Sequence, residues 1–376
     1  MKGRGRSTSA WHNPLSPTLV VEESTTNHRA AAGVTDYAKL KRLIQEAGLL
    51  RKQPYFYLAL ISINTMLLAL CLAGFVIFKN PWVVALNAIA LAVISGQHGF
   101  QLHDAGHHQM FARKWKNTVV GFVTADLLLG MSYGWWVQKH NRHHANPNHV
   151  DLDPDINNPA IVYTEEQALR RRGPLRLLAR YQAYLFFPLL GLLAWSMHLT
   201  GTVFLATRRS RYRRLEVVTL LAHLAIYVGF LVYFLGPWSA LLVIVIHKAI
   251  GGFYLASVFA PNHKGMLQTS DESDLDFLRA QVLTSRNIRG SLLTDLLFGS
   301  LNYQVEHHLF PAMPRNRVRH ANRIVREFCR QAGVSYYETS VFQSYRELLA
   351  FLHSVGAPLR SRGLPKQPNE AEAAGF

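Results

Sequence analysis

The residues best suited to chemistry in this chain are histidines, which number 18 among 376 residues and gather in four short clusters. "HDAGHH" (103–108) and "HNRHH" (140–144) space histidines three or four residues apart, which puts them on one face of a helix. "PNHKG" (261–265) and "QVEHH" (304–308) follow later in the chain. Neutral imidazole binds iron, zinc, copper and nickel. The clusters supply eight candidate metal ligands: His103, His107, His140, His143, His144, His263, His307 and His308.

Eight imidazoles are more than one metal ion can use, so the clusters predict a site for two metals. A structural zinc site has four ligands and usually includes cysteine. The only cysteines here, Cys71 and Cys329, are far apart in the sequence. A shell rich in nitrogen and poor in carboxylate fits two redox-active irons that activate dioxygen.

Five further residues are candidates for additional ligands or for supporting roles: Gln304, His108, Asn262, Asp104 and Glu306. A ligating histidine usually donates its second ring N–H to a carboxylate or carbonyl. Asp104 and Glu306, with Asp153 and Asp155, are candidates for that acceptor role.

Other histidines stand alone and are expected at the surface or at the membrane interface, namely His98, His149, His198, His223 and His320. His247 and Lys248 differ because they lie inside an apolar block. Ionisable residues within a membrane span are often functional. The alternative is a shorter helix with Lys248 reaching to the interface, and the sequence leaves both open.

Four long apolar stretches must position these clusters. Residues 53–78 carry no charge, and after "KNP" a second uncharged stretch runs to Leu102. Residues 215–235 and 237–260 form another pair around "GPW". About 20 apolar residues span a bilayer as a helix. The sequence therefore predicts four transmembrane helices in two hairpins.

Basic residues predict the orientation of these helices. The apolar stretch 181–206 has arginine-rich flanks at 170–180 and at 208–214. Because such flanks favour the cytoplasmic side, this stretch should lie in the interface or dip back. Residues 117–137 contain Asp126 and need not cross. All four clusters then share the cytoplasmic face with both chain termini.

The predicted fold class is an all-α polytopic membrane protein with a cytoplasmic helical cap that carries the two metals. Residues 35–50 have helical apolar spacing, with Thr35 as a candidate N-cap. The net charge of +17 reflects topology and not nucleic-acid binding. The predicted regions are 1–50 (cytoplasmic, with an amphipathic helix), 51–100 (hairpin 1), 101–214 (cytoplasmic or interfacial), 215–260 (hairpin 2) and 261–376 (cytoplasmic).

With "HDAGH", "HNRHH" and "QVEHHLFP" in this order, the sequence resembles the membrane fatty acid desaturase family from about residue 50 to about residue 345. Gln304, where many members carry histidine, resembles the front-end (delta-6-like, linoleoyl-CoA) branch. "PNHKGM" and "QVLTSRNIRG" resemble actinobacterial members of that branch.

The three quoted motifs are the histidine boxes of this family. The resemblance implies that the eight histidines hold two iron ions, with Gln304 in place of the first histidine of the third box, "QVEHHLFP". It also implies that dioxygen and two electrons convert a fatty acyl-CoA or acyl-lipid to a product with a cis double bond. The chain carries no HPGG haem motif. The electrons are therefore expected from a separate ferredoxin, reductase or cytochrome b5-like protein at the cell membrane.

Two alternatives remain at this point. A fatty acyl or lipid hydroxylase would use the same boxes. A zinc-binding membrane receptor, hydrolase or transporter belongs to another class, although a transporter should place its ligands in mid-membrane. The position of the double bond, the chain length and the carrier are not encoded in the boxes.

Overall fold

The computed structural model describes residues 26–208, 210 and 212–361. Within these ranges the chain is mostly helical, which confirms the predicted all-α class. The strands there are two pairs of residues, β1 (Asn287–Ile288) and β2 (Glu338–Thr339), which pair in parallel. The part of the N-terminal region before residue 26 lies outside the described residues.

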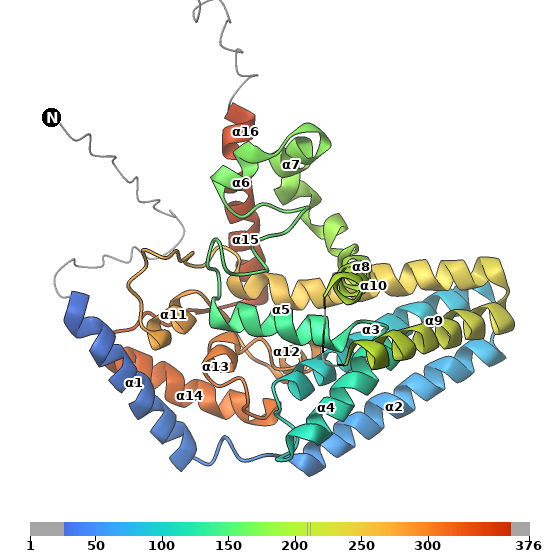
Figure 1. The fold of residues 1–376 in the computed structure, drawn as a ribbon, viewed down its shortest axis with the longest axis horizontal. Coiled ribbons are helices and arrows are strands. Elements are labelled where there is room, and N and C mark those ends of the chain that lie inside the picture. Colours follow the sequence, from blue (N-terminus) through green and yellow to red (C-terminus); the bar gives the residue numbers. More distant parts are fainter. Residues whose placement is uncertain (1–25, 209, 211, 362–376) are drawn as a thin grey trace, which may run out of the picture.

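Four helices are long and apolar enough to cross a membrane: α2 (Pro54–Ile77), α3 (Pro81–Gly106), α9 (Arg213–Leu235) and α10 (Pro237–His263). They form the two hairpins that the sequence predicts. In Figure 1 they lie side by side and extend away from the shorter helices. Asn80 begins α3 by accepting hydrogen bonds from the backbone N–H groups of Trp82 and Val83, as an N-cap residue should.

The two helices that carry histidines at their ends, α3 and α10, pack closely along their length. Small residues permit the approach, since a side chain at Gly96 would collide with the ring of Tyr254. Gly251 lies opposite Ala92, where an added Cβ would make an ordinary contact at 3.9 Å. This packing fixes the separation between the histidine of "PNHKG" and those of "HDAGHH".

The stretch 117–137 does not form a span. It folds as α4 (Lys114–Phe122), a π-helical turn η1 (Val123–Leu129) and the start of α5 (Tyr133–Ala145). Gly130 ends η1 with a positive φ of 71°, which glycine adopts without steric cost. The chain thereby returns to the cap, as the sequence predicts.

The stretch 181–206 falls in α7 (Gly173–Leu190) and α8 (Leu193–Thr207), which are bent by 86° at the break between them. Gly252 of α10 lies against this break, where an added Cβ would stand 2.9 Å from the backbone N of Ala194. A bend of this size suits a segment that dips back, and its orientation in the bilayer stays a prediction.

The remaining helices form the cap. They are α1 (Thr26–Glu46), α6 (Glu165–Arg170), α11 (Phe277–Leu283), α12 (Leu292–Leu297), α13 (Gln304–Leu309), α14 (Arg315–Gln331), α15 (Val341–Val355) and α16 (Ala357–Ser361). A core of Leu40, Leu278, Val305 and Val325 joins α1, α11, α13 and α14. The expected N-cap role of Thr35 is wrong, because α1 begins at Thr26 and Thr35 lies inside it.

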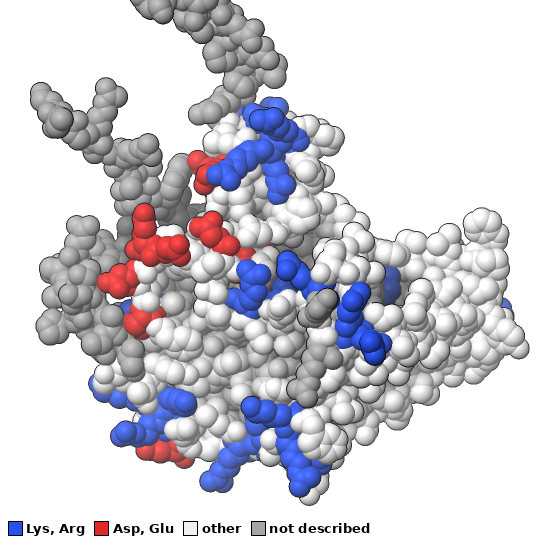
Figure 2. Space-filling model, in the orientation of Figure 1, with Lys and Arg blue, Asp and Glu red and all other residues white. Residues whose placement is uncertain are grey.

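Charge separates the two halves of the molecule. Figure 2 shows lysine and arginine side chains over the cap and over its junction with the four long helices. The far part of those helices is almost free of charge on the face in view. Leu70 and Leu86 are among its exposed apolar side chains, as expected for a surface that faces lipid.

Candidate metal centre

Four helices bring the histidines together between the long helices and the cap. His103 lies in the last turn of α3, and His107 follows at its C-terminal end. His140, His143 and His144 share one face of α5, whose first turn is capped by Ser132. His263 closes α10, and His307 and His308 lie on the short helix α13.

The larger of two groups contains five histidines, whose candidate ligand atoms all lie within 4.8 Å of one another. The Nε2 atom of His307 is 3.1 Å from that of His103 and 3.0 Å from that of His144. His140 Nε2 is 3.2 Å from His144 Nε2, and its ring stacks on Trp136. The members are His103, His107, His140, His144 and His307.

The second group consists of His143, His263 and His308. The Nδ1 atom of each ring meets an acceptor: the Asp153 carboxylate at 3.0 Å, the Thr284 carbonyl at 3.0 Å and the Gln281 amide oxygen at 2.8 Å. Because these acceptors accept hydrogen bonds from Nδ1–H, each Nε2 is unprotonated and carries a lone pair, and that of His263 also lies 2.8 Å from the Gln304 amide nitrogen. His143 Nε2 and His263 Nε2 nevertheless face each other at 3.3 Å.

This arrangement fits metal ions and not a network of hydrogen bonds alone. Two unprotonated nitrogens that face each other repel unless a cation lies between them. The Nε2 atoms of His107 and His308 are also buried without a hydrogen-bond partner among the described residues. An unpaired buried nitrogen is costly, and ligation of a metal ion removes that cost. The donor set therefore fits two metals, one at each group.

The electrostatics keep the rings neutral, as metal ligands must be. Burial lowers the pKa of these imidazoles well below its usual value, and the neighbouring histidines lower it further. The effect covers His107, His140, His144, His307 and His308.

Carboxylates support the site from two sides. Asp153 is fully buried and also accepts from the backbone N–H groups of Asn148 and Asp155. Asp155 lies 3.6 Å from His143 Nδ1 and pairs with Lys139. The His143 imidazole and Lys264 lower the pKa of Asp153 against the opposing effect of burial. Asp153 therefore stays ionised and holds the His143 ring.

Asp104 supports the first group, as the sequence suggests. Its carboxylate lies 3.4 Å from His103 Nδ1 and accepts a hydrogen bond of 2.5 Å from Arg315. Arg315 thus ties the end of α3 to α14. This arginine, like Gln281 and Thr284, is not among the sequence candidates, because no local motif marks a residue that acts through a partner far along the chain.

Gln304 and Asn262 lie at the second group. The Gln304 side-chain amide is 2.8 Å from His263 Nε2, and its oxygen accepts from Asn262 Nδ2. Asn262 also donates to the Leu301 carbonyl. Both side chains therefore border the site, with Asn262 holding Gln304 in place.

Two sequence candidates lie elsewhere. His108 belongs to neither group, adopts a positive φ of 54°, and has its carbonyl bound by Lys52. The Glu306 side chain points away from the two histidine groups. Its two carboxylate oxygens accept hydrogen bonds from Asn287, at 2.6 Å, and from Tyr336, at 2.7 Å. Burial raises the pKa of Glu306 to about 7. Glu306 thus anchors α13 to the cap.

The isolated histidines are less exposed than the sequence suggests. His98 is buried and bonded to Gln101, so its expected surface position is wrong. His198 and His223 meet the carbonyl groups of Gly130 and Leu127 at the end of η1. His149 is buried near Asp271, whereas His320 is exposed.

The intramembrane pair also has internal partners. His247 is 2.9 Å from the Ser95 hydroxyl and 2.7 Å from the Tyr227 hydroxyl. Lys248 is buried, with its ammonium over the Tyr227 ring. Neither residue joins a metal-binding group. The pair belongs to the interior of the long helices, so the shorter-helix explanation is wrong.

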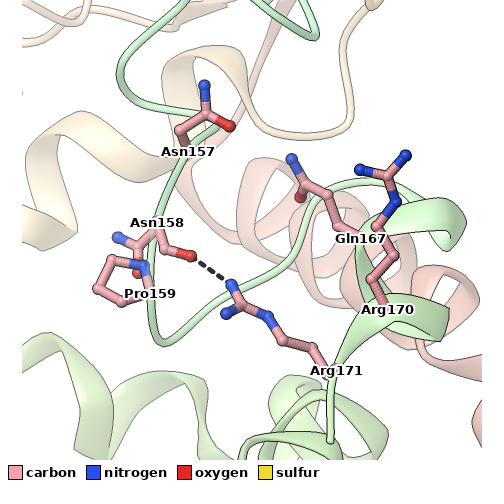
Figure 3. Close-up of a pocket in the computed structure, with 6 residues that line it drawn as sticks. All are labelled: Asn157, Asn158, Pro159, Gln167, Arg170 and Arg171. Atoms are coloured by element: carbon pink, nitrogen blue, oxygen red, sulfur yellow. Dashed lines mark hydrogen bonds between the residues drawn. The ribbon is translucent and has the colours of Figure 1, made fainter.

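A surface pocket of about 450 Å³ lies outside the metal centre, next to the loop that carries Asp153 and Asp155. Figure 3 shows Arg171 donating to the backbone carbonyl of Asn158, at 2.7 Å, across this pocket. Arg170 pairs with Glu166 at its rim. Arg171 thus holds the loop to the end of α6, whereas the Arg170–Glu166 pair lies within that helix. The lining residues are Asn157, Asn158, Pro159, Gln167, Arg170 and Arg171.

Comparisons with known proteins agree with the geometry. The sequence model of the family described as fatty acid desaturase matches residues 80–340. The chain is 32% identical over 333 residues to the acyl-lipid (9-3)-desaturase of Physcomitrium patens, which covers 85% of this chain and 62% of that protein. It therefore spans less than two thirds of the length of that relative.

Two further relatives cover more of their own length. The Delta(8)-fatty-acid desaturase of Euglena gracilis is 30% identical over 329 residues, 84% of this chain and 78% of that protein. The Delta(5) fatty acid desaturase fat-4 of Caenorhabditis elegans is 29% identical over 332 residues, 84% of this chain and 73% of that protein.

The lowered pKa of the clustered imidazoles predicts how metal-free protein responds to acid. Unfolded histidine has a pKa of about 6.5, so below that pH the unfolded state binds more protons than the folded state. The free energy of unfolding should fall from about pH 7 to 5, because the lowered pKa values of five imidazoles outweigh the raised pKa of Glu306, which acts in the opposite direction. Chemical denaturation of metal-free protein in micelles measures it, and a flat profile to pH 5 would contradict neutral, desolvated rings.

Replacing Asp153 tests its role as the support of His143. Asp153→Asn keeps the shape but loses the negative charge, and should weaken metal binding about 10- to 100-fold. A chelator competition assay measures the affinity. Asp151→Asn is the matched control, because Asp151 is exposed on the same loop. Equal affinities for the two variants would rule out the supporting role.

Proposed function

Because this chain belongs to the fatty acid desaturase family, we propose that it is a fatty acyl desaturase that introduces a cis double bond into an acyl chain. The cofactors proposed are two iron ions, with dioxygen as co-substrate. Their ligands are the eight histidines of the two groups, with Gln304 and Asn262 at the border of the second.

One observation carries this proposal. The Nε2 atoms of His143 and His263 meet at 3.3 Å while both Nδ1 atoms are already bonded to acceptors. That geometry favours a cation between the two nitrogens. The group of five imidazoles lies beside it and would hold a second cation. A pair of nitrogen-rich sites suits redox-active iron better than a closed structural zinc site.

The reaction removes two hydrogen atoms from neighbouring carbons of the chain. Together with two protons and two electrons from a donor, these hydrogens reduce one dioxygen to two waters. Bound iron would supply the oxidising power that an unactivated C–H bond requires. The protein contributes the fixed ligand shell and the burial that keeps bulk water away.

The position of the centre also supports an acyl substrate. His103 and His263 stand at the cap ends of α3 and α10, the two closely packed spans. An acyl chain that lies among the long helices can therefore reach the site without leaving an apolar environment. The carrier is either CoA or a membrane lipid, the latter being the one named in the Physcomitrium patens relative.

We further propose that the new bond lies near the carboxyl end of the acyl chain. The names of the similar proteins place their products at Delta(5) and Delta(8) positions, which are counted from that end. Gln304 in the third box supports the same front-end branch. The proposal places the centre and both termini on the cytoplasmic side of the cell membrane. A separate ferredoxin, reductase or cytochrome b5-like protein then delivers the electrons.

Expression in a host that lacks the activity tests the proposal, followed by analysis of total acyl chains. We expect a new cis double bond with the full sequence and none with His307→Ala, because His307 bridges the rings of His103 and His144. His320→Ala is the matched control, since His320 is exposed and outside both groups; it should retain activity.

The same cultures separate the alternatives. A hydroxylated acyl product would show that the protein is a hydroxylase on the same scaffold and not a desaturase. Purified protein that holds zinc, with no oxygen-dependent product in iron-supplied membranes, would reject both oxidative functions. Activity that survives in His307→Ala would reject the assigned ligands.

A further inference from the structure

The short helix α12 presents an unusual surface. It begins after Ser291, which caps it through the backbone N–H of Thr294. Its four leucines are exposed, at 84% for Leu292, 64% for Leu293, 60% for Leu296 and 39% for Leu297. A helix exposed to water would carry polar residues at such positions, and a contiguous apolar patch marks an interaction surface.

The polar face of α12 points into the protein. The Asp295 carboxylate accepts from Asn302 Nδ2 at 3.0 Å and lies 3.4 Å from the Tyr303 hydroxyl. Arg319 of α14 approaches the same carboxylate. These bonds fix the rotation of α12 about its own axis, so its leucines face away from the protein.

Two side chains of the spanning helices hold the end of α12. Gln97 of α3 donates to the Leu296 carbonyl at 3.2 Å, and the Tyr254 hydroxyl of α10 donates to the Leu297 carbonyl at 2.7 Å. The last carbonyl groups of a helix have no partner within it. Lipid cannot supply one. The Leu296 carbonyl also accepts from the backbone N–H of Gly299 at 3.3 Å, so it is at the Leu297 carbonyl that the Tyr254 hydroxyl takes the place of water.

The same two contacts set the depth of α12. Gln97 comes sixteen residues after Pro81, the outer start of α3, which is about 24 Å along a helix. Tyr254 comes seventeen residues after Pro237, about 25 Å along α10. The hydrocarbon layer is about 30 Å thick. Both helices, from opposite hairpins, place the end of α12 inside that layer.

We propose that α12 lies in the bilayer, with its leucines among the acyl chains of the leaflet on the side of the metal centre. Lipid is the occupant because this surface continues the lipid-facing surface of α3 and α10. Gly299 strengthens the attachment, since its φ of +56° and its approach to Phe100 of α3 leave no room for a side chain.

This placement matters for the centre. Asn302, which binds Asp295 of α12, also donates to the Ile288 carbonyl and is followed closely by Gln304, His307 and His308. The bilayer then helps to hold "QVEHH" through α12, in addition to the contacts of α12 with α3 and α10. The inference requires only a membrane location and stands apart from the proposed reaction.

Depth-dependent fluorescence quenching tests the proposal in proteoliposomes of phosphatidylcholine and phosphatidylglycerol. The full chain carries Cys71→Ser and Cys329→Ala, with one new cysteine labelled by a polarity-sensitive dye. Leu292→Cys and Leu296→Cys report on α12. Leu70→Cys, on the lipid-facing surface of α2, and Glu327→Cys, exposed on α14, are the matched controls.

We expect phosphatidylcholine with a nitroxide on its acyl chain to quench the dye at both α12 positions as strongly as at Leu70. Aqueous iodide should quench it only at Glu327. Iodide quenching at both α12 positions without lipid quenching would overturn the proposal. Protection from both quenchers would overturn it too, because a protein surface would then cover the leucines. Two α12 positions guard against a single label that disturbs packing.

Discussion

The structure depends on holding the unprotonated nitrogens of eight imidazoles close together in a buried space. Such nitrogens repel one another and lose their hydrogen bonds to water, so the arrangement is unfavourable until metal ions occupy it. The protein must therefore impose it. His143 and His263 show how, because an acceptor on Nδ1 directs each Nε2 toward the other. The free energy of metal binding offsets the cost of this preorganisation.

Every major packing feature serves that constraint. Gly96 lets α3 and α10 pack closely, which fixes the positions of the histidines at their ends relative to each other. The break between α4, η1 and α5 returns the chain to the same face of the membrane, so that "HNRHH" meets "HDAGHH". The buried Glu306 and Asn287, together with the half-buried Tyr336, then hold α13 in the cap. The long helices thus position three of the eight candidate ligands, and α5 and α13 position the other five.

The histidine clusters and the hairpins could be predicted because they are local patterns: helical spacing within a cluster, and apolar length between charged flanks. The supports could not. Gln281 and Thr284 bond to His308 and His263, which are 27 and 21 residues away in sequence, and Arg315 bonds to Asp104, which is 211 residues away. No helical spacing relates these residues to their partners. Glu306 is a wrong candidate for the same reason. The residues next to it in the sequence are candidate ligands, but its own side chain points away from them. Thr35 resembles an N-cap, yet α1 continues past it from Thr26.

The central claim is that the two histidine groups hold one iron each. Anomalous X-ray diffraction at the iron edge, on crystals of protein loaded with iron, tests it most directly. We expect two separate peaks in each molecule, one within the five-histidine group and one bordered by His143, His263 and His308. A single peak, no peak at the second group, or anomalous signal at the zinc edge alone would contradict the account.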